Sequence, residues 1–489
     1  MSRIKIYFAV ALVSALTLTV ILFNQGSSVW TIEKFKSQKL DWQNCYDNFE
    51  CSTFKVPVNY EKIDSEVFTL KVLRHSAADQ GRKLGAIIVN PGGPGGSATD
   101  YAYNAESIVS KEINDRYDII GFDPRGINNS QPIRCLTNSE EDEFLDAGTT
   151  RNNAAEIADL VAISKSFAEK CAKAAGSKLG HYSTLETAKD LEILRILLGE
   201  PKLNYLGKSY GTYLGTIYAA LYPNSVGRFV LDGAVAPKIS LRDQELAQAI
   251  GFGEALNNYL ASQKQYTIED ITKLIKQSEV NPLTDVNSRK ATQSLIVTAI
   301  AQSLYNQSSG WPQLTSALNQ AILKKNPEKI LELADQYNSR DSSGNYYSNQ
   351  NDISIMITCL DWQEQRSVED MSKDQVAFAQ KSSVFGPYLS FAGLPCKYWK
   401  AEPKLPKVSL TKIDTAPILI IGVTKDPATP YKWAKTLAAA FTNSQLITLN
   451  GEGHTGHGRG NKCVDTAVDT YFLTGKSSPG SLICSQSGN

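Results

Sequence analysis

LNYLGKSYGTYLG, residues 203–215, is the stretch that decides the fold of this 489-residue chain. Its apolar start predicts a buried strand over residues 203–206, and residues 212–221 follow with the spacing of a helix. Between them Ser209 stands in the string G-x-S-x-G. Glycines two positions before and two after the serine let strand and helix approach closely, and the turn lifts the hydroxyl clear of the sheet. We therefore predict a nucleophile elbow; the alternative interpretation is an ordinary tight turn.

Strand and helix patterns alternate on both sides of this turn. Residues 68–73 alternate like an edge strand, whereas other short runs are wholly apolar, as buried parallel strands are. Buried strands are predicted at residues 86–89, 117–122, 228–231, 418–421 and 445–449, and helices at residues 154–175, 184–198 and 431–441. Strands that alternate with helices indicate an α/β fold with a mostly parallel central sheet, right-handed crossovers and flanking helices.

Residues 237–400 break this pattern and indicate a large helical cap inserted into the sheet domain. Helical spacing continues there, at residues 241–260, 293–304 and 328–337, without a convincing buried strand. We expect residues 29–236 and 401–489 to form the two parts of the core. The polar stretch 338–351 is expected to be an exposed loop.

Composition limits the classes of partner. The hydrophobic fraction of 42% and the charged fraction of 20% are those of an ordinary globular protein. Lys and Arg, 50 in number, balance the 50 Asp and Glu, so the formal net charge is +0. Because no basic tract is present to neutralise a run of phosphates, we expect no nucleic-acid partner.

The amino-terminal residues 1–28 are typical of an export signal. Arg3 and Lys5 precede an apolar, uncharged stretch at residues 6–23, and the small residues Gly26 and Ser28 follow it. The stretch is long for a cleaved signal peptide and near the lower limit of a membrane span. Cleavage and retention as a membrane anchor both stay open, and we expect a secreted or periplasmic protein.

Eight cysteines agree with export, because an even number of cysteines is typical of disulfide-bonded secreted proteins. The sequence leaves their connectivity open, but closing short loops costs the least chain entropy. We therefore predict the local pairs Cys45–Cys51, Cys135–Cys171, Cys359–Cys396 and Cys463–Cys484. A metal site is the competing interpretation. Since no CxxC pair occurs and no His stands at ligand spacing from a Cys, no metal is expected.

A serine nucleophile needs a base, and the chain offers four histidines. His75 and His181 precede Ser209, whereas an elbow of this kind is followed along the chain by an acid and then a histidine. His454 fits this order, in a glycine-containing loop after the last predicted strand. His457 is its nearest rival, with a backbone-bonded loop residue as its other interpretation.

The acid should follow an earlier strand and hold the imidazole in the right tautomer. Asp426 fits best, because it follows the predicted strand 418–421 and precedes Pro427, where the chain turns. Asp232, which ends the predicted strand 228–231, is the second choice. A simple turn aspartate is the alternative interpretation of Asp426.

Two backbone groups are candidates for an oxyanion hole. One is the amide of Tyr210, directly after the nucleophile, and the other is an amide of the glycine-rich loop 90–96, for which we choose Gly93. A phosphate-binding loop is the competing interpretation of these glycines. The loop lacks the terminal Lys followed by Ser or Thr and the G-x-G-x-x-G spacing that phosphate loops have.

Together these motifs resemble those of the tripeptidyl aminopeptidases and the related proline iminopeptidases, secreted α/β-hydrolases with a helical cap. The resemblance covers most of the chain. It rests on NPGGPGGS (90–97), GFDPRG (121–126), LNYLGKSYGTYLG (203–215), FVLDG (229–233), DPATP (426–430) and GHTGHG (453–458). It implies the α/β-hydrolase fold, the triad Ser209, Asp426 and His454, and hydrolysis of peptides from a free N-terminus without a cofactor.

Such exopeptidases resemble one another in binding the substrate's α-ammonium with carboxylates of the cap, since a desolvated cation needs a fixed anion. Asp361 is the first candidate, within an acidic and aromatic stretch beside a predicted disulfide. Glu364 and Glu452 are the next choices. A solvated carboxylate on a helix surface is the alternative interpretation of Asp361.

Three hypotheses follow for the activity. The first is an exported aminopeptidase that forms an acyl-enzyme on Ser209. The second is a carboxylesterase or another acyl hydrolase with the same machinery, and the third is a non-catalytic binding protein on a hydrolase scaffold.

Overall fold

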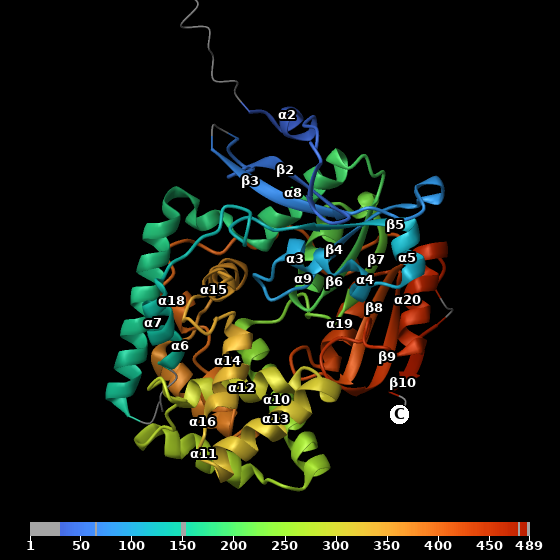
Figure 1. The fold of residues 1–489 in the computed structure, drawn as a ribbon. Coiled ribbons are helices and arrows are strands. Elements are labelled where there is room, and N and C mark those ends of the chain that lie inside the picture. Colours follow the sequence, from blue (N-terminus) through green and yellow to red (C-terminus); the bar gives the residue numbers. More distant parts are fainter. Residues whose placement is uncertain (1–29, 64–65, 148–152, 478–479, 487–489) are drawn as a thin grey trace, which may run out of the picture.

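The computed structural model describes residues 30–63, 66–147, 153–477 and 480–486, so the predicted export signal at residues 1–28 lies outside the described residues. Within these ranges the centre is a ten-stranded sheet in the order β1-β2-β3-β5-β4-β6-β7-β8-β9-β10 (Figure 1). Its strands are β1 (Gln43–Tyr46), β2 (Phe49–Pro57), β3 (Val67–His75), β4 (Gly85–Asn90), β5 (Tyr117–Phe122), β6 (Leu203–Lys208), β7 (Val226–Asp232), β8 (Ile418–Lys425), β9 (Ser444–Glu452) and β10 (Leu482–Ser485).

Most of the sheet is parallel, as predicted. Strand β4 pairs in parallel with β5 and β6, and parallel pairing continues through β7, β8 and β9 to β10. Strands β1, β2, β3 and β5 pair antiparallel. The prediction of an edge strand at residues 68–73 was wrong, because β3 is bonded to β2 on one side and to β5 on the other. Its alternation arises because only one of its faces is fully buried.

Helices cover both faces of the sheet. Successive residues of a strand point to opposite faces, so Ile88 of β4 lies in one core with Leu191 and Ile217, and Ile87 lies in the other with Val468. The helices outside the insertion are α2 (Ile32–Lys36), α3 (Ala98–Tyr103), α4 (Ala105–Ile108), α5 (Lys111–Arg116), α6 (Asn138–Asp146), α7 (Ala154–Ala175), α8 (Thr184–Leu197), α9 (Tyr210–Leu221), α19 (Tyr431–Ala440) and α20 (Lys462–Thr474).

The segment between β7 and β8 is helical, apart from isolated β-bridges in its described part. Its helices are α10 (Leu241–Gln263), α11 (Ile268–Val280), α12 (Gln293–Leu304), α13 (Gln307–Leu318), α14 (Glu328–Asn338), α15 (Gln350–Asp361), α16 (Val368–Lys381), α17 (Gly386–Leu389) and α18 (Leu394–Lys397). Many of them share a hydrophobic core of their own, around Leu256, Ile300 and Leu314. Figure 1 shows α10 to α14 and α16 gathered below the sheet. Helix α15 packs instead on the core of the sheet, through Ile353 and Met356.

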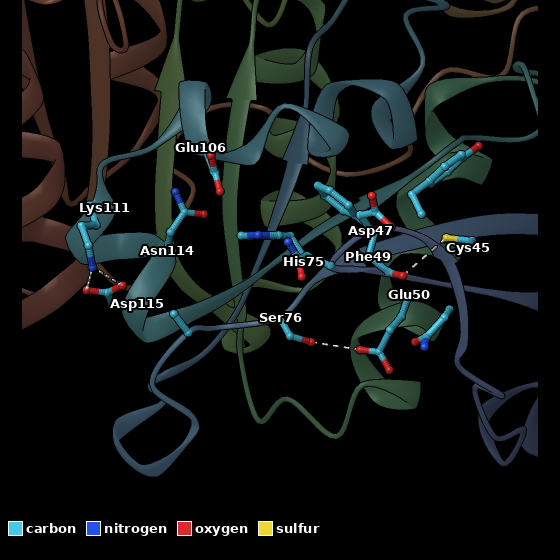
Figure 2. A pocket seen from close by; sticks show the side chains of 14 residues that line it. Cys45, Asp47, Phe49, Glu50, His75, Ser76, Glu106, Lys111, Asn114 and Asp115 are labelled. Carbon is cyan, nitrogen blue, oxygen red and sulfur yellow. Dashed lines mark hydrogen bonds and ion pairs between the residues drawn. The ribbon is translucent and has the colours of Figure 1, made fainter.

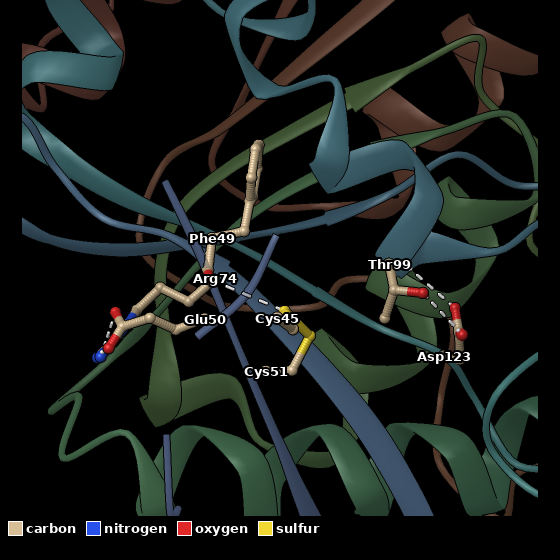
Figure 3. Close-up of a disulfide and its surroundings, with 7 residues drawn as sticks. All are labelled: Cys45, Phe49, Glu50, Cys51, Arg74, Thr99 and Asp123. Atoms are coloured by element: carbon tan, nitrogen blue, oxygen red, sulfur yellow. Dashed lines mark hydrogen bonds and ion pairs between the residues drawn. A yellow bond between two sulfur atoms is a disulfide. The ribbon is translucent and has the colours of Figure 1, made fainter. Parts of the chain in front are cut away.

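All four predicted disulfides form. Cys45–Cys51 closes the hairpin of β1 and β2 (Figure 3), and Cys463–Cys484 joins α20 to β10. Disulfides of this kind persist in oxidising compartments. Among the described helices, none has both the length and the apolar composition needed to cross a membrane.

One pocket opens beside the β1–β2 hairpin (Figure 2), lined in part by Phe49, His75 and Asn114. Asn114 precedes β5, so the pocket lies toward the amino ends of the parallel strands. The elbow serine follows the carboxyl end of β6, and the pocket is therefore separate from it.

Candidate active site

Ser209 occupies the turn between β6 and α9, as the elbow prediction requires. Its φ of +55° and ψ of −125° lie outside the regions that residues with side chains favour. A Cβ on Gly207 would lie 2.5 Å from the carbonyl oxygen of Gly211, and a Cβ on Gly211 would lie 2.8 Å from Asn90 Oδ1. Only glycine fits these two positions, so the G-x-S-x-G string is a requirement of the tight turn.

The glycine-rich loop after β4 passes directly beside the elbow. A Cβ on Gly92 would lie 2.5 Å from the carbonyl oxygen of Lys208, 2.9 Å from Ser209 Cβ and 3.0 Å from Tyr210 N. Gly92 and Gly93 have φ of +94° and +111°, which glycine adopts readily. The segment that carries Gly93 therefore lies next to the amide of Tyr210, the first residue of α9.

Asp426 and His454 face each other after the neighbouring strands β8 and β9. The imidazole Nδ1 of His454 lies 2.9 Å from both carboxylate oxygens of Asp426. The carboxylate is buried, and it accepts hydrogen bonds from the N–H groups of Ala428 and Thr429 at 2.9 and 2.8 Å and from the Thr429 hydroxyl at 3.0 Å. Because Nδ1 is engaged, Nε2 is the nitrogen left for proton transfer.

The end of β7 supports both the serine and the histidine. Ser209 N donates to the carbonyl oxygen of Asp232 at 2.9 Å. A Cβ on the next residue, Gly233, would lie 3.1 Å from Cε1 of His454. The described residues show no hydrogen bond between the Ser209 hydroxyl and the imidazole, and such bonds often tighten only when substrate binds.

Tyr305, at the C-terminal end of α12, contacts His454 from the helical insertion. Its carbonyl oxygen accepts a hydrogen bond from His454 N at 2.8 Å, and its ring meets the imidazole edge-on with centroids 5.3 Å apart. The Tyr305 ring also packs against Phe252 of α10. Sequence reasoning missed this contact, because no local pattern links a helix end to a loop so distant in the chain.

Asp232 and His457, the rivals for acid and base, hold the loop that carries His454. The carboxylate oxygens of Asp232 accept hydrogen bonds from the N–H groups of Gly456 and His457 at 2.8 and 2.9 Å. Burial and the charge of Lys208 lower the pKa of the His457 ring to about 3, so this ring is neutral at pH 7.

Asp361, the first candidate for substrate binding, lies buried at the end of α15. Its oxygens accept hydrogen bonds from Thr184 N at 2.8 Å and from the Thr184 hydroxyl at 2.5 Å. The same hydroxyl contacts the hydroxyl of Tyr210. Burial raises the pKa of Asp361 to about 7.

Glu364 and Glu452 each lie beside a cation. Nη2 of Arg366 is 2.5 Å from Glu364 Oε2 and also 2.5 Å from Glu245 Oε2. Its Nη1 lies 3.1 Å from Asp374 Oδ2, so three carboxyl groups share one guanidinium. Glu452 lies 2.6 Å from Lys425 Nζ. In the part of the chain that the structure describes, no group of three or more His, Cys, Asp or Glu is placed to hold a metal ion.

Known proteins are similar to this chain in sequence over most of its length. A family profile described as alpha/beta hydrolase fold matches residues 85–460. The chain is 31% identical to the serine protease Hip1 of Mycobacterium tuberculosis, over 99% of this chain and 98% of that protein.

Two further relatives have similar identities. The tripeptidyl aminopeptidase of Streptomyces lividans is 30% identical, over 91% of this chain and 86% of that protein. Carboxylesterase B of M. tuberculosis is 31% identical, over 89% of this chain and 86% of that protein. The chain therefore belongs to the α/β hydrolase family, as a serine hydrolase.

Proposed function

We propose that this serine hydrolase is an exported aminopeptidase, which releases short peptides or single residues from free N-termini through an acyl-enzyme on Ser209. The observation that carries the proposal is the contact of His454 Nδ1 with both oxygens of the buried Asp426. A serine hydroxyl is a poor nucleophile near neutral pH, and an oriented imidazole is what activates it.

His454 takes the hydroxyl proton of Ser209 on Nε2 while Oγ attacks the scissile carbonyl carbon. The amides of Gly93 and Tyr210 bind the oxyanion, and one such donor is worth roughly 100- to 1000-fold in rate. His454 then gives the proton to the leaving amine as the C–N bond breaks. Water, deprotonated by the same imidazole, hydrolyses the ester, and Asp426 stabilises the imidazolium in both halves.

The substrate's α-ammonium needs a fixed anion opposite it. We propose Glu364 for this role, because it belongs to a cluster of three carboxyl groups, with Glu245 and Asp374, around the guanidinium of Arg366. Asp361 becomes the second choice, since burial raises its pKa to about 7 and so leaves it partly protonated at neutral pH. Glu452 is the third choice, because a lysine neutralises it.

Two observations support the substrate class and the compartment. The serine protease and the tripeptidyl aminopeptidase are peptidases by name and match nearly the whole chain. Four disulfides support an oxidising compartment and hence export.

The test compares two tripeptide coumarylamides that differ only in acetylation of the N-terminus. We expect the free amine to be cleaved about 100-fold faster, which is the order of effect of losing one buried charge pair. Ser209→Ala should abolish cleavage of both, and Glu364→Gln should shrink the preference for the free amine. Equal turnover of the two peptides would contradict the aminopeptidase.

The similarity to carboxylesterase B favours a second candidate, an esterase with the same machinery. A p-nitrophenyl ester turned over much faster than any free-amine peptide would favour it. A wild-type protein whose Ser209 does not react with a fluorophosphonate would favour a binding protein instead.

A further inference from the structure

Asp232, the last residue of β7, bonds both the elbow and the loop that carries His454. Its carbonyl oxygen accepts the N–H of Ser209 at 2.9 Å. Its carboxylate is fully buried, and its two oxygens accept the N–H groups of Gly456 and His457 at 2.8 and 2.9 Å. One residue therefore fixes the backbone of the nucleophile relative to the loop of the imidazole.

Lys208, immediately before Ser209, makes a third attachment to the same loop. Its Nζ donates to the carbonyl oxygen of His457 at 2.7 Å. Burial lowers the pKa of Lys208, and the negative charge of Asp232 opposes that change. A buried amine and a buried carboxyl group on the two strands that meet at the nucleophile are costly to desolvate, and such groups gather at functional sites.

The loop needs these attachments because its backbone is strained. Thr455 has φ of +64°, which a β-branched residue rarely adopts. A conformation of this kind persists only where the surroundings over-determine it. Thr455 lies between His454 and Gly456. Asp232 and Lys208 bond the residues that follow it, Gly456 and His457, and so hold the chain on the C-terminal side of Thr455.

We propose that Asp232 and Lys208 are positioning residues that hold His454 at its working distance from Ser209. This inference rests on the proposed roles of that serine and histidine. Asp232 supports the loop instead of replacing Asp426, because Nδ1 of His454 is bonded to Asp426, whereas the carboxylate of Asp232 accepts the N–H groups of Gly456 and His457. Loss of either support lets the imidazole drift and slows proton transfer, while substrate binding is unaffected.

Fluorophosphonate inactivation tests this without a peptide substrate. Ser209 Oγ bonds to phosphorus, fluoride leaves, and His454 takes the hydroxyl proton. The maximal inactivation rate therefore reports the base, and the half-saturating probe concentration reports binding. The variants are Asp232→Asn, which keeps the shape but offers one acceptor in place of two, and Lys208→Met, which removes the donor.

We expect the maximal rate to fall about 100-fold in Asp232→Asn and about tenfold in Lys208→Met, because misplacing a reacting group by about 1 Å costs up to 100-fold. The half-saturating concentration should stay within about twofold of wild type, and Lys208→Arg, which restores a donor, should recover most of the rate. If Asp232→Asn does not fold, the two Lys208 variants decide.

Asp118→Asn is the matched control. Asp118 is a buried carboxylate in β5 that accepts the N–H of Ala77 at 3.0 Å and lies 2.6 Å from Lys83 Nζ, near the amino end of its strand. It should lose stability and keep the wild-type inactivation rate. Maximal rates within about threefold of wild type in both Asp232→Asn and Lys208→Met would overturn the proposal.

An equal fall in the inactivation rate in Asp118→Asn would overturn the proposal as well.

Different outcomes would refute the proposed function. A wild-type protein that is labelled but cleaves no free-amine peptide would refute the aminopeptidase and leave the comparison of inactivation rates valid. Absence of labelling in the wild type would refute Ser209 as the nucleophile and this inference with it.

Discussion

Gly233 lies where an added methyl group would press on the imidazole. A Cβ there would come within 3.1 Å of Cε1 of His454, 3.0 Å of Cγ2 of Thr455 and 3.2 Å of Oγ1 of Thr429. Each of these contacts is tighter than side chains normally tolerate, and all three neighbours belong to the loops that hold His454 and Asp426. We expect Gly233→Ala to lower kcat about 100-fold, on the scale of misplacing a catalytic group by about 1 Å.

The left-handed backbone conformation of Gly233 should affect stability more than kcat. Gly199, a glycine with nearly the same φ, serves as the control for this backbone effect. Gly233 has φ of +70°, where alanine costs about 1–2 kcal/mol, and a less flexible unfolded chain returns about 0.4–1 kcal/mol. Gly199 has φ of +72° with nothing within 4 Å of its added Cβ. Gly199→Ala should therefore lose about 1 kcal/mol in urea unfolding, and Gly233→Ala should lose at least as much, because its close contacts add to the same backbone cost. Only Gly233→Ala should lose kcat; a wild-type kcat, or an equal loss in Gly199→Ala, would refute the reasoning.

Three further results are expected. Asp426→Asn should lower kcat about 10⁴-fold with KM unchanged in steady-state assays, because His454 loses its orienting anion. Burial raises the pKa of Glu141 from 4.5 to about 7, so the folded chain keeps a proton that the unfolded chain releases between these values. Stability should then fall as pH rises through this window, and Glu141→Gln should remove that slope in urea unfolding. Replacing Cys359 and Cys396 by alanine opens a loop with a sequence separation of 37 and should cost about 4 kcal/mol in thermal unfolding.

The features that the sequence predicted well are local ones. The strand, the turn at Ser209 and the helix after it are specified by adjacent residues, because two glycines must occupy positions where any Cβ would overlap backbone atoms or Asn90. The four disulfides were predictable because each couple closes a short loop. In the sequence, only the turn residues after Asp426 favoured it over Asp232. In the structure, Asp426 contacts the imidazole of His454, and Asp232 contacts the N–H groups of Gly456 and His457.

The features that were missed depend on distant parts of the chain. Strand β10 has four residues and is held by Cys463–Cys484 and by pairing with β9, so it has little pattern of its own. β3 lies inside the sheet because β2 pairs with it. The sequence of β2 contains no short apolar run that would predict a buried strand. The burial of Asp361 depends on Thr184, which lies in a different helix. No property of the acidic stretch itself indicates that partner.

The backbone carbonyl of Tyr305 has a consequence for protein engineering. Tyr305 lies at the C-terminal end of α12 and therefore belongs to the helical insertion, and its carbonyl oxygen also accepts a hydrogen bond from His454 N. Exchanging the insertion between relatives to alter substrate preference would therefore disturb the general base, unless the graft presents an acceptor at the same place. We therefore expect selectivity and turnover to change together when this insertion is exchanged.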